Sequence, residues 1–325
     1  MTYAIRIHRP GTERALKWEK VKLGKPGPGE LLLRQTAIGL NFIDVYHRTG
    51  LYKLPSYPAT IGTEAAGIVE AVGPEVHEFK PGDRVAYAPL VGAYAQQRLI
   101  PAARVVKIPE GIADEQAAAM MLKGMTAQYL IRRTYRVQKG EWVLLHAAAG
   151  GVGSIAAQWL KHLGARVIGT AGGAEKVAQA EAHGCEVVID YNKQKKLAEK
   201  VREITEGAGV AVVYDGVGKS VYKQSLDSIR PLGTYVNYGN ASGPIKAVNP
   251  LELSQKGSLY FTRPTLMTYT ARRDDLVGTA NELFQAVLSG AVTIEVKQRY
   301  PLKSTAQAHR DLEAHKTTGS TVLLP

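Results

Sequence analysis

The chain has 325 residues, of which 45% are hydrophobic and 22% charged, a balance typical of folded globular proteins. Its formal net charge of +12 indicates an anionic partner, either a phosphate-rich cofactor or nucleic acid. The single cysteine, Cys185, excludes an intramolecular disulfide and a thiolate zinc cage, and it favours the reducing cytoplasm as the compartment. We expect no membrane partner, because no apolar stretch approaches the ~20 residues of a membrane span.

The first 120 residues are predicted to be rich in β-strands. Short apolar runs at 30–34, 66–73 and 83–87 are separated by Gly and Pro at close intervals. Pro presets φ and Gly supplies positive φ, so the Pro-Gly segments between the runs indicate turns. This pattern predicts a compact, partly open barrel.

The pattern changes near residue 113. Residues 113–133 are rich in Ala, Leu and Met and are predicted to form one long or broken helix. From residue 141 onward, strands alternate with helices, with strands predicted at 143–147, 166–170, 186–190, 210–214 and 233–238 and helices at 155–163, 174–183 and 196–201. This alternation predicts parallel βαβ units and a doubly wound parallel sheet, and hence the α/β class.

After residue 261 the alternation ends. A predicted helix at 274–289 precedes a short β-like tail, which we expect to rejoin the first domain. The chain is therefore divided into a β-rich domain, residues 1–122 with 263–325, and a nucleotide-binding domain, residues 123–262.

The segment from Ala147 to Ser154 follows a predicted buried strand and opens a predicted helix, which is the context of a dinucleotide-binding turn. Gly150 would let the backbone approach a pyrophosphate, and Gly153 would let the helix pack closely on the strand. Free N–H groups at the helix N-terminus would face the phosphates. Ala148 replaces the first glycine of the usual motif, so the βα units that follow are needed to favour cofactor binding over a structural glycine turn.

The end of the second predicted strand indicates which cofactor is bound. NAD-binding proteins carry an acidic residue there, about 20 residues beyond the first glycine, which binds the ribose 2′-hydroxyl. Here Gly172 and Gly173 leave room for a 2′-phosphate, and Lys176 follows one helical turn later. A surface helix lysine is the alternative explanation of Lys176. We interpret the pattern as favouring NADPH over NADH.

Five sequence blocks together resemble a known family. The most specific block runs from Gly140 to Lys161 and contains the glycine turn, and the others cover 39–52, 62–67, 123–129 and 257–264. In combination they are similar to the quinone oxidoreductases related to ζ-crystallin, which belong to the medium-chain dehydrogenase/reductase superfamily. The resemblance spans most of the chain and is strongest to bacterial NADPH:quinone reductases.

This resemblance implies a GroES-like catalytic domain built from both chain ends, a Rossmann domain and a homodimer. It implies NADPH-dependent reduction of quinones by hydride transfer without a metal. The residues implied near the nicotinamide or the quinone are Asn41, Asp44, Tyr46, Tyr52 and Thr126. The residues implied in cofactor binding are Phe42, Lys123, Tyr129, Gly150, Gly151, Val152, Gly153, Gly172, Gly173, Lys176, Tyr191, Gly239, Asn240 and His315. His315 stands where the family has a basic residue, which leaves its contact with phosphate open.

The zinc enzymes of the superfamily offer a contrast. Their catalytic ligands would fall near Leu40, at Thr63 or Glu64, and at Lys123, and none of these positions is a cysteine. Without a metal, hydrogen bonds must polarise the substrate, and we expect Tyr46 and Tyr52 to flank a flat acceptor and donate to it.

Two rival functions remain open. An enone or 2-alkenal reductase would use the same NADPH site and attack a C=C bond beside a carbonyl. A crystallin-like or single-stranded nucleic-acid-binding protein is the less favoured rival, because the chain has no RNA-binding motif and no stacked aromatic platform.

Overall fold

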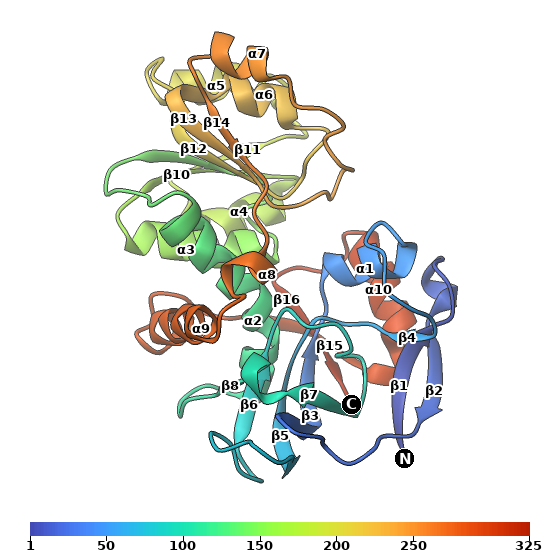
Figure 1. Cartoon of the computed structure of the whole chain (residues 1–325). Coiled ribbons are helices and arrows are strands. Elements are labelled where there is room, and N and C mark those ends of the chain that lie inside the picture. Colours follow the sequence, from blue (N-terminus) through green and yellow to red (C-terminus); the bar gives the residue numbers. More distant parts are fainter. The chain divides into compact units, whose positions relative to one another are not determined.

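The computed structural model describes residues 1–325 and shows two compact units within the chain (Figure 1). Unit 1 consists of Met1–Met125, Thr270–Leu288 and Ile294–Pro325. Unit 2 consists of Thr126–Tyr269 and Ser289–Thr293. One unit is dominated by antiparallel strands and the other by a parallel sheet with helices, which confirms the α/β class predicted from the sequence.

Unit 1 is built on a seven-stranded sheet in the order β15-β16-β3-β5-β6-β8, with β7 also paired to β3. Its strands are β3 (Glu30–Gly39), β5 (Glu64–Val72), β6 (Arg84–Tyr87), β7 (Gln97–Pro101), β8 (Val106–Lys107), β15 (Val296–Pro301) and β16 (Ser320–Leu324). A second sheet in the order β2-β1-β4 contains β1 (Thr2–Ile7), β2 (Lys17–Val21) and β4 (Ala59–Thr60). The C-terminal strand β16 pairs with β3, so the tail does rejoin the first domain as predicted.

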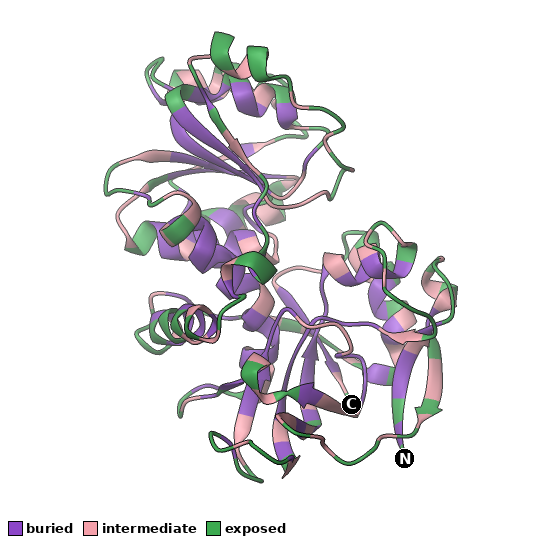
Figure 2. Cartoon of the chain, viewed as in Figure 1, coloured by how far each residue is buried: buried purple, intermediate pink, exposed green.

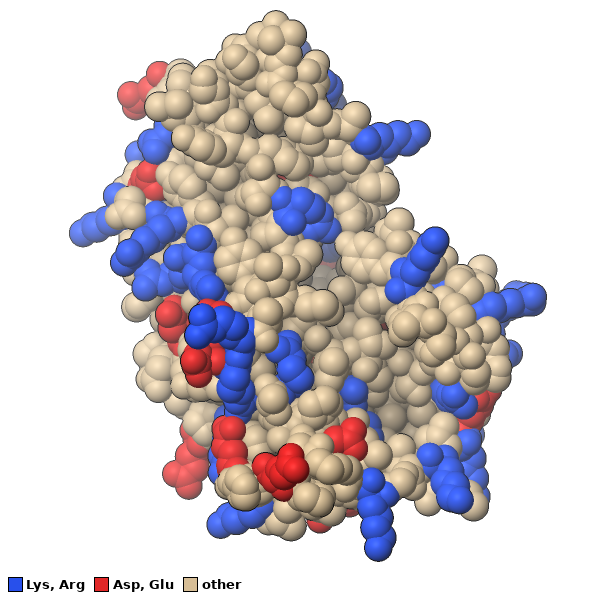
Figure 3. All heavy atoms as spheres, in the orientation of Figure 1, with Lys and Arg blue, Asp and Glu red and all other residues tan.

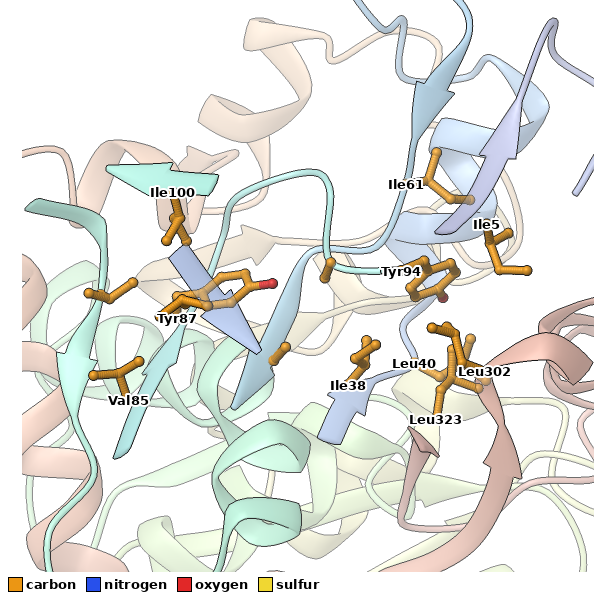
Figure 4. Close-up of a cluster of buried hydrophobic side chains, with 14 of the residues drawn as sticks. Ile5, Ile38, Leu40, Ile61, Val85, Tyr87, Tyr94, Ile100, Leu302 and Leu323 are labelled. Atoms are coloured by element: carbon orange, nitrogen blue, oxygen red, sulfur yellow. The ribbon is translucent and has the colours of Figure 1, made fainter. Parts of the chain in front are cut away.

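The core of unit 1 is aliphatic with two buried tyrosines. Side chains from β1, β3, β5 and the C-terminal segment surround Tyr87 and Tyr94, which have no exposed surface (Figure 4). From Leu31 to Ala37 alternate residues of β3 are buried, as expected for a strand with one face on the core. Figure 2 shows that buried residues are concentrated in the sheets, whereas exposed residues lie mainly in loops and on outer helix faces.

The tail differs from the sequence prediction in one respect. Helix α10 (Thr305–Glu313) lies between β15 and β16, where only β-structure was expected. Its buried face consists of Thr305, Ala308 and His309. Because only one of these side chains is hydrophobic, the 3.6-residue periodicity that identifies an amphipathic helix is hidden.

Unit 2 contains a six-stranded parallel sheet in the order β11-β10-β9-β12-β13-β14. Its strands are β9 (Trp142–Leu145), β10 (Arg166–Ala171), β11 (Val187–Asp190), β12 (Val210–Asp215), β13 (Ile229–Asn237) and β14 (Tyr260–Thr262). This is the Rossmann order, in which the strand order reverses beside the first strand and ligands bind at the carboxyl ends there. The five predicted strands are confirmed, whereas β14 was missed because it has only three residues.

Helices connect these strands. Those of unit 2 are α3 (Gly151–His162), α4 (Ala174–Ala182), α5 (Leu197–Ile204), α6 (Tyr222–Asp227), α7 (Pro250–Gln255) and α8 (Leu266–Tyr269), and unit 1 carries α1 (Phe42–Thr49) and α9 (Arg273–Leu288). Helix α2 (Asp114–Tyr129) continues into a π-helical turn at Leu130–Thr134, which confirms the broken-helix prediction. No helix is long and apolar enough to cross a membrane.

The positive charge is not concentrated in one strip of the visible surface. Lys and Arg side chains are spread over the face shown in Figure 3, and a smaller number of acidic side chains lie among them, mainly in the lower part and at the left edge of the view. The +12 charge of the chain therefore gives no single basic track on this face.

Candidate active site

The loop before α1 is held by a buried carboxylate, Asp44. Asn41 is the N-cap of α1, and Asp44 accepts a hydrogen bond from the Asn41 backbone N–H at 2.9 Å. The other two donors are the hydroxyls of Thr63, at 2.9 Å, and Tyr94, at 2.8 Å. Asp44 has no exposed surface, so its role is to fix the polypeptide around it.

Asp44 is poised between its two charge states. Burial raises the pKa of Asp44 to about 7, because desolvation outweighs the hydrogen bonds from Tyr94, Thr63 and Asn41. The nearby Glu64 also raises this pKa through like-charge repulsion. The first turn of α1 thus contains a carboxylate whose charge depends on its hydrogen-bond donors.

A second buried carboxylate, Glu64, lies on the other side of Asn41. Its Oε1 accepts from the Asn41 carboxamide at 2.7 Å and pairs with the Lys123 ammonium at 2.7 Å. Its Oε2 accepts from the Leu122 backbone N–H at 2.6 Å. An ion pair therefore occupies two of the positions where the zinc enzymes would place ligands. No group of three or more His, Cys, Asp or Glu side chains is arranged to hold a metal ion.

Three aromatic rings cluster on and just after α1. The Tyr46 and Tyr52 rings meet edge to face with centroids 5.2 Å apart, and the His47 ring lies 6.1 Å from Tyr52. Burial lowers the pKa of His47, and its Nδ1 has no hydrogen-bond partner. Two of the side chains implied near the nicotinamide or the quinone are thus in direct contact, and His47 packs beside them.

Phe42 and His315 also come together within unit 1. Their ring centroids are 6.3 Å apart, although the residues lie at opposite ends of the chain. His315 follows α10 and has a positive φ of 56°. Two of the side chains implied in cofactor binding are thus neighbours in space.

The glycine turn of unit 2 has the shape expected of a phosphate-binding turn. Gly150 is the N-cap of α3 and has no side chain with which to cap the helix. The N–H groups of Gly151, Val152 and Gly153 consequently open the helix without a side-chain acceptor. A Cβ on Gly153 would overlap the Ala147 carbonyl oxygen, so only glycine lets α3 pack this closely on the turn.

Buried side chains at the end of β9 and on neighbouring elements hold the start of the glycine turn in place. His146, at the end of β9, contacts the Thr170 hydroxyl through Nδ1 at 3.1 Å and the Ser225 hydroxyl through Nε2 at 2.8 Å. The Thr170 hydroxyl accepts from the Ala147 N–H at 3.3 Å. Burial lowers the pKa of His146, which keeps this support uncharged.

The region predicted to surround a 2′-phosphate is assembled at the ends of β10 and β11. The Tyr191 ring lies against Gly172, where a Cβ would overlap its hydroxyl and ring, and Tyr191 is 52% exposed. Gly173 has a positive φ of 88° and precedes α4, which carries Lys176.

Asp190 is a residue that the sequence interpretation missed in this region. Its carboxylate accepts from the backbone N–H groups of Gly173, at 3.2 Å, and Asn192, at 3.0 Å. These hydrogen bonds lower the pKa of Asp190. Asp190 thereby fixes the backbone beside Gly172, although the sequence places it on a different strand.

A further buried carboxylate, Asp215, supports the loop that contains Gly239 and Asn240. It accepts from the Tyr235 hydroxyl, from the Asn237 carboxamide at 3.1 Å and from the Gly218 N–H at 2.9 Å. A Cβ on Gly239 would overlap the Gly216 backbone, so this loop requires glycine for close approach. Gly239 was among the residues implied by the resemblance, whereas Asp215 was not identified from the sequence.

The remaining candidates lie near the end of α2. Thr126 and Tyr129 are buried, and the Tyr129 ring stacks on Tyr269 with centroids 4.5 Å apart.

Cys185 is buried against Gly169, and burial raises the pKa of its thiol to about 12. This agrees with a packing role for Cys185.

These features fit a dinucleotide with an additional phosphate. The donors at the start of α3 are backbone N–H groups in a glycine turn, which suits a pyrophosphate. At the end of β10 the chain presents glycine, an exposed tyrosine ring and Lys176, and no carboxylate. The nearby Asp190 carboxylate, from β11, accepts hydrogen bonds from the backbone N–H groups of Gly173 and Asn192.

Comparison with known proteins agrees with both units. Residues 27–110 match the family described as "Alcohol dehydrogenase GroES-like domain", and residues 151–285 match the family described as "Zinc-binding dehydrogenase". The GroES-like and Rossmann domains of a medium-chain dehydrogenase/reductase are therefore both present.

Individual relatives make the assignment narrower. A quinone oxidoreductase from Pseudomonas aeruginosa is 50% identical over the full length of both chains. A 2-haloacrylate reductase from a Burkholderia species is 46% identical, over 100% of this chain and 99% of that protein. The structure of Escherichia coli quinone oxidoreductase complexed with NADPH superposes with a TM-score of 0.97 at 45% identity, covering 99% of this chain and 100% of the other. The chain belongs to the quinone oxidoreductase family.

Proposed function

We propose that this chain reduces quinones, with NADPH as the electron donor and without a metal ion. The observation that carries the proposal is the glycine turn at the start of α3, which opens a helix with uncapped N–H groups at the switch point of a Rossmann sheet. Family membership supports the choice of acceptor, and the paired Lys123 and Glu64 support a reaction that needs no zinc.

The cofactor would be held in three parts. The pyrophosphate would lie on the N–H groups of the turn at residues 150–153, and the 2′-phosphate would lie among Gly172, Gly173, Tyr191 and Lys176. The remaining proposed contacts come from Phe42, Lys123, Tyr129, Gly239, Asn240 and His315. Lys176 would supply positive charge to the 2′-phosphate and so favour NADPH over NADH.

When bound, NADPH would supply the hydride. The side chains would align and polarise the acceptor, because a quinone accepts hydride readily once it is oriented and water is excluded. Tyr46 and Tyr52 would flank the flat ring and donate hydrogen bonds to its oxygen as negative charge develops. Asn41 and Thr126 would position substrate or ribose, and Asp44 would hold the start of α1, where Asn41 is the N-cap and Tyr46 lies on the helix.

Reduction of an activated C=C bond is the second candidate. The 2-haloacrylate reductase relative, at 46% identity, favours it specifically, because such an acceptor is an alkene conjugated to a carboxylate. The same hydrogen-bond donors would stabilise charge on the conjugated oxygen. The two candidates therefore differ in the acceptor and not in the cofactor.

We also propose a homodimer in the cytoplasm. The edge strand β14 supports the dimer, because its outer side has no strand partner and Tyr260 on it is 63% exposed. The single cysteine, buried at Cys185, suits a reducing compartment.

The test is steady-state oxidation of NADPH, with NADH as the comparison, across a panel of quinones, 2-alkenals and 2-haloacrylates in the presence of a chelator. We expect NADPH oxidation with quinones that the chelator does not reduce. A preference for the alkenes would select the second candidate, and absence of NADPH oxidation with every acceptor would reject both.

A further inference from the structure

A buried line of polar side chains runs from Asp44 through unit 1 to α10. The Tyr94 hydroxyl, from the loop between β6 and β7, lies 2.8 Å from Asp44 Oδ2 and 3.1 Å from His309 Nε2. His309 Nδ1 lies 3.2 Å from the Arg48 guanidinium. Arg48 makes a bidentate pair with Glu313, at 2.8 Å for each bond, where the line reaches the protein surface.

The direction of every hydrogen bond in this line follows from its outer end. Arg48 can only donate, so His309 Nδ1 must accept from it. A neutral His309 therefore carries its proton on Nε2 and donates to the Tyr94 oxygen, which leaves the Tyr94 proton for Asp44. Burial and the charge of Arg48 lower the pKa of His309 to about 3, so the neutral ring is the form present at ordinary pH.

The line of polar side chains lies inside an apolar core, where each buried polar group destabilises the fold unless it has a hydrogen-bond partner. The Tyr94 ring packs with Ile5, Ile61 and Leu302 (Figure 4). Both Tyr94 and His309 have no exposed surface. Partly satisfied polar groups in a core are strongly destabilising, whereas a complete chain of hydrogen bonds polarises its members in one direction.

Asp44 is the one charged group of this line and its surroundings that has no ionic partner. Glu64 is neutralised by Lys123, and Arg48 is neutralised by Glu313. Asp44 has no cation in contact and depends on hydroxyl and N–H donors. Tyr94 is the donor that connects Asp44 to His309 and, through His309, to the Arg48 N–H group.

We infer that Tyr94 and His309 are positioning residues for catalysis, forming a one-way chain of buried hydrogen bonds that keeps Asp44 a carboxylate and thereby holds Asn41 and the first turn of α1, which carries Tyr46. This inference rests on the proposed function for its effect on catalysis. It assigns a role to two side chains that neither the motifs nor the comparisons single out.

The test compares Tyr94→Phe with Tyr87→Phe. Tyr87 is an equally buried tyrosine of the same core whose hydroxyl donates to the neutral Gln35, so its loss removes a hydrogen bond without touching Asp44. The pH dependence of kcat/KM with the best acceptor is measured for both variants and the wild type. We expect Tyr94→Phe to move the acid limb upward by about one pH unit, because a hydrogen bond to a charged group is lost, while Tyr87→Phe leaves the limb in place.

A second readout needs neither cofactor nor acceptor. The melting temperature of each apo variant is measured at pH 5.5 and pH 8. Tyr94→Phe should lower it more at pH 8, where Asp44 is charged and lacks its donor, than at pH 5.5, where Asp44 is protonated. The deficit of Tyr87→Phe should be the same at both pH values, because Gln35 does not titrate.

A histidine pair covers the case in which Tyr94→Phe does not fold. His309→Leu should shift the acid limb in the same direction by a smaller amount, because Asp44 keeps the Tyr94 hydroxyl. His309→Gln should restore part of the wild-type profile, since an amide can accept from Arg48 and donate to Tyr94.

The inference is overturned if Tyr94→Phe and His309→Leu change stability by the same amount at both pH values and leave the acid limb unmoved. Inactivity of the wild type with every acceptor would reject the proposed function instead, and the melting-temperature comparison would still decide the role of Tyr94 and His309.

Discussion

The two candidate binding regions are built by opposite means. In unit 2 the turn at residues 150–153 presents backbone N–H groups, and glycine is required because a Cβ on Gly153 would overlap the Ala147 carbonyl oxygen. In unit 1 the segment around Asn41 is held by side chains that come from the residue before β5, from the loop before β7 and, through Tyr94, from α10. A backbone site depends on shape, whereas a side-chain site depends on charge and hydrogen-bond direction.

The largest expected effect comes from changing the shape of the turn. Gly153→Val should weaken NADPH binding at least about tenfold, because the added atoms force α3 away from the turn and disperse its N–H donors. Binding is measured by fluorescence titration of NADPH. Gly278→Ala is the matched control, since a Cβ there meets nothing within 4 Å, and it should bind NADPH as the wild type does. Equal affinity in Gly153→Val would show that the turn does not hold the cofactor.

The charge of Asp44 is the corresponding feature in unit 1. Asp44→Asn should lower kcat/KM about a hundredfold, because the amide turns one acceptor into a donor facing Thr63, Tyr94 or the Asn41 N–H. NADPH affinity should change much less than it does in Gly153→Val. A variant that retained wild-type kcat/KM across the pH range would remove Asp44 from the account.

Within unit 2, Lys176 tests whether a side-chain charge contributes to cofactor binding in addition to the backbone turn. Lys176→Ala should reduce the ratio of NADPH to NADH affinity about tenfold, because the 2′-phosphate loses a charge-assisted contact while NADH loses nothing. Lys25→Ala, at an exposed lysine of unit 1, controls for the change in net charge. An unchanged ratio would make Lys176 an ordinary surface lysine.

Stability should fall as the pH is lowered through the ordinary pKa of histidine. Burial lowers the pKa values of His47, His146 and His309, so the unfolded chain binds protons there that the folded chain does not. Asp44 acts oppositely, since its pKa is raised to about 7 and its proton stabilises the folded state as pH falls. Because Asp44 offsets the histidines, the drop in melting temperature between pH 7 and pH 5 should be clearest in Asp44→Asn, in which only the three histidines of these four groups titrate. A rise over that interval would contradict the neutral state of the buried histidines.

The smallest expected effect on activity concerns the dimer. Tyr260→Lys should shift the protein toward monomer in sedimentation velocity while activity changes little, because a charge on the edge of β14 opposes strand pairing. Tyr57→Lys is the control, at an exposed tyrosine of unit 1. An unaltered sedimentation coefficient in Tyr260→Lys would place any dimer contact elsewhere.

The same contrast explains what could be predicted from the sequence. The glycine turn and the βα alternation are local patterns, so the parallel sheet and its first five strands were predicted from neighbouring residues. Asp190 accepts from the backbone N–H of Gly173, which lies 17 positions away on the preceding βα connection, and no local pattern connects the two residues.

The side-chain network around Asp44 in unit 1 shows most clearly which contacts could not be predicted from the sequence. Tyr94 and His309 are separated by 215 positions in the sequence and meet only because α10 packs onto the barrel core. Helix α10 itself was missed, since its buried face is mostly polar. Family resemblance identified Asn41, Asp44 and Tyr46 as candidates, but it could not supply the partners that set the charge of Asp44.

The most direct test of the central claim is equilibrium binding of NADPH and NADH to the purified wild-type chain, followed by nicotinamide fluorescence. We expect saturable binding of NADPH that is tighter than that of NADH and that is competed by 2′-phosphorylated adenosine nucleotides. Absence of saturable NADPH binding, or a preference for NADH, would contradict it.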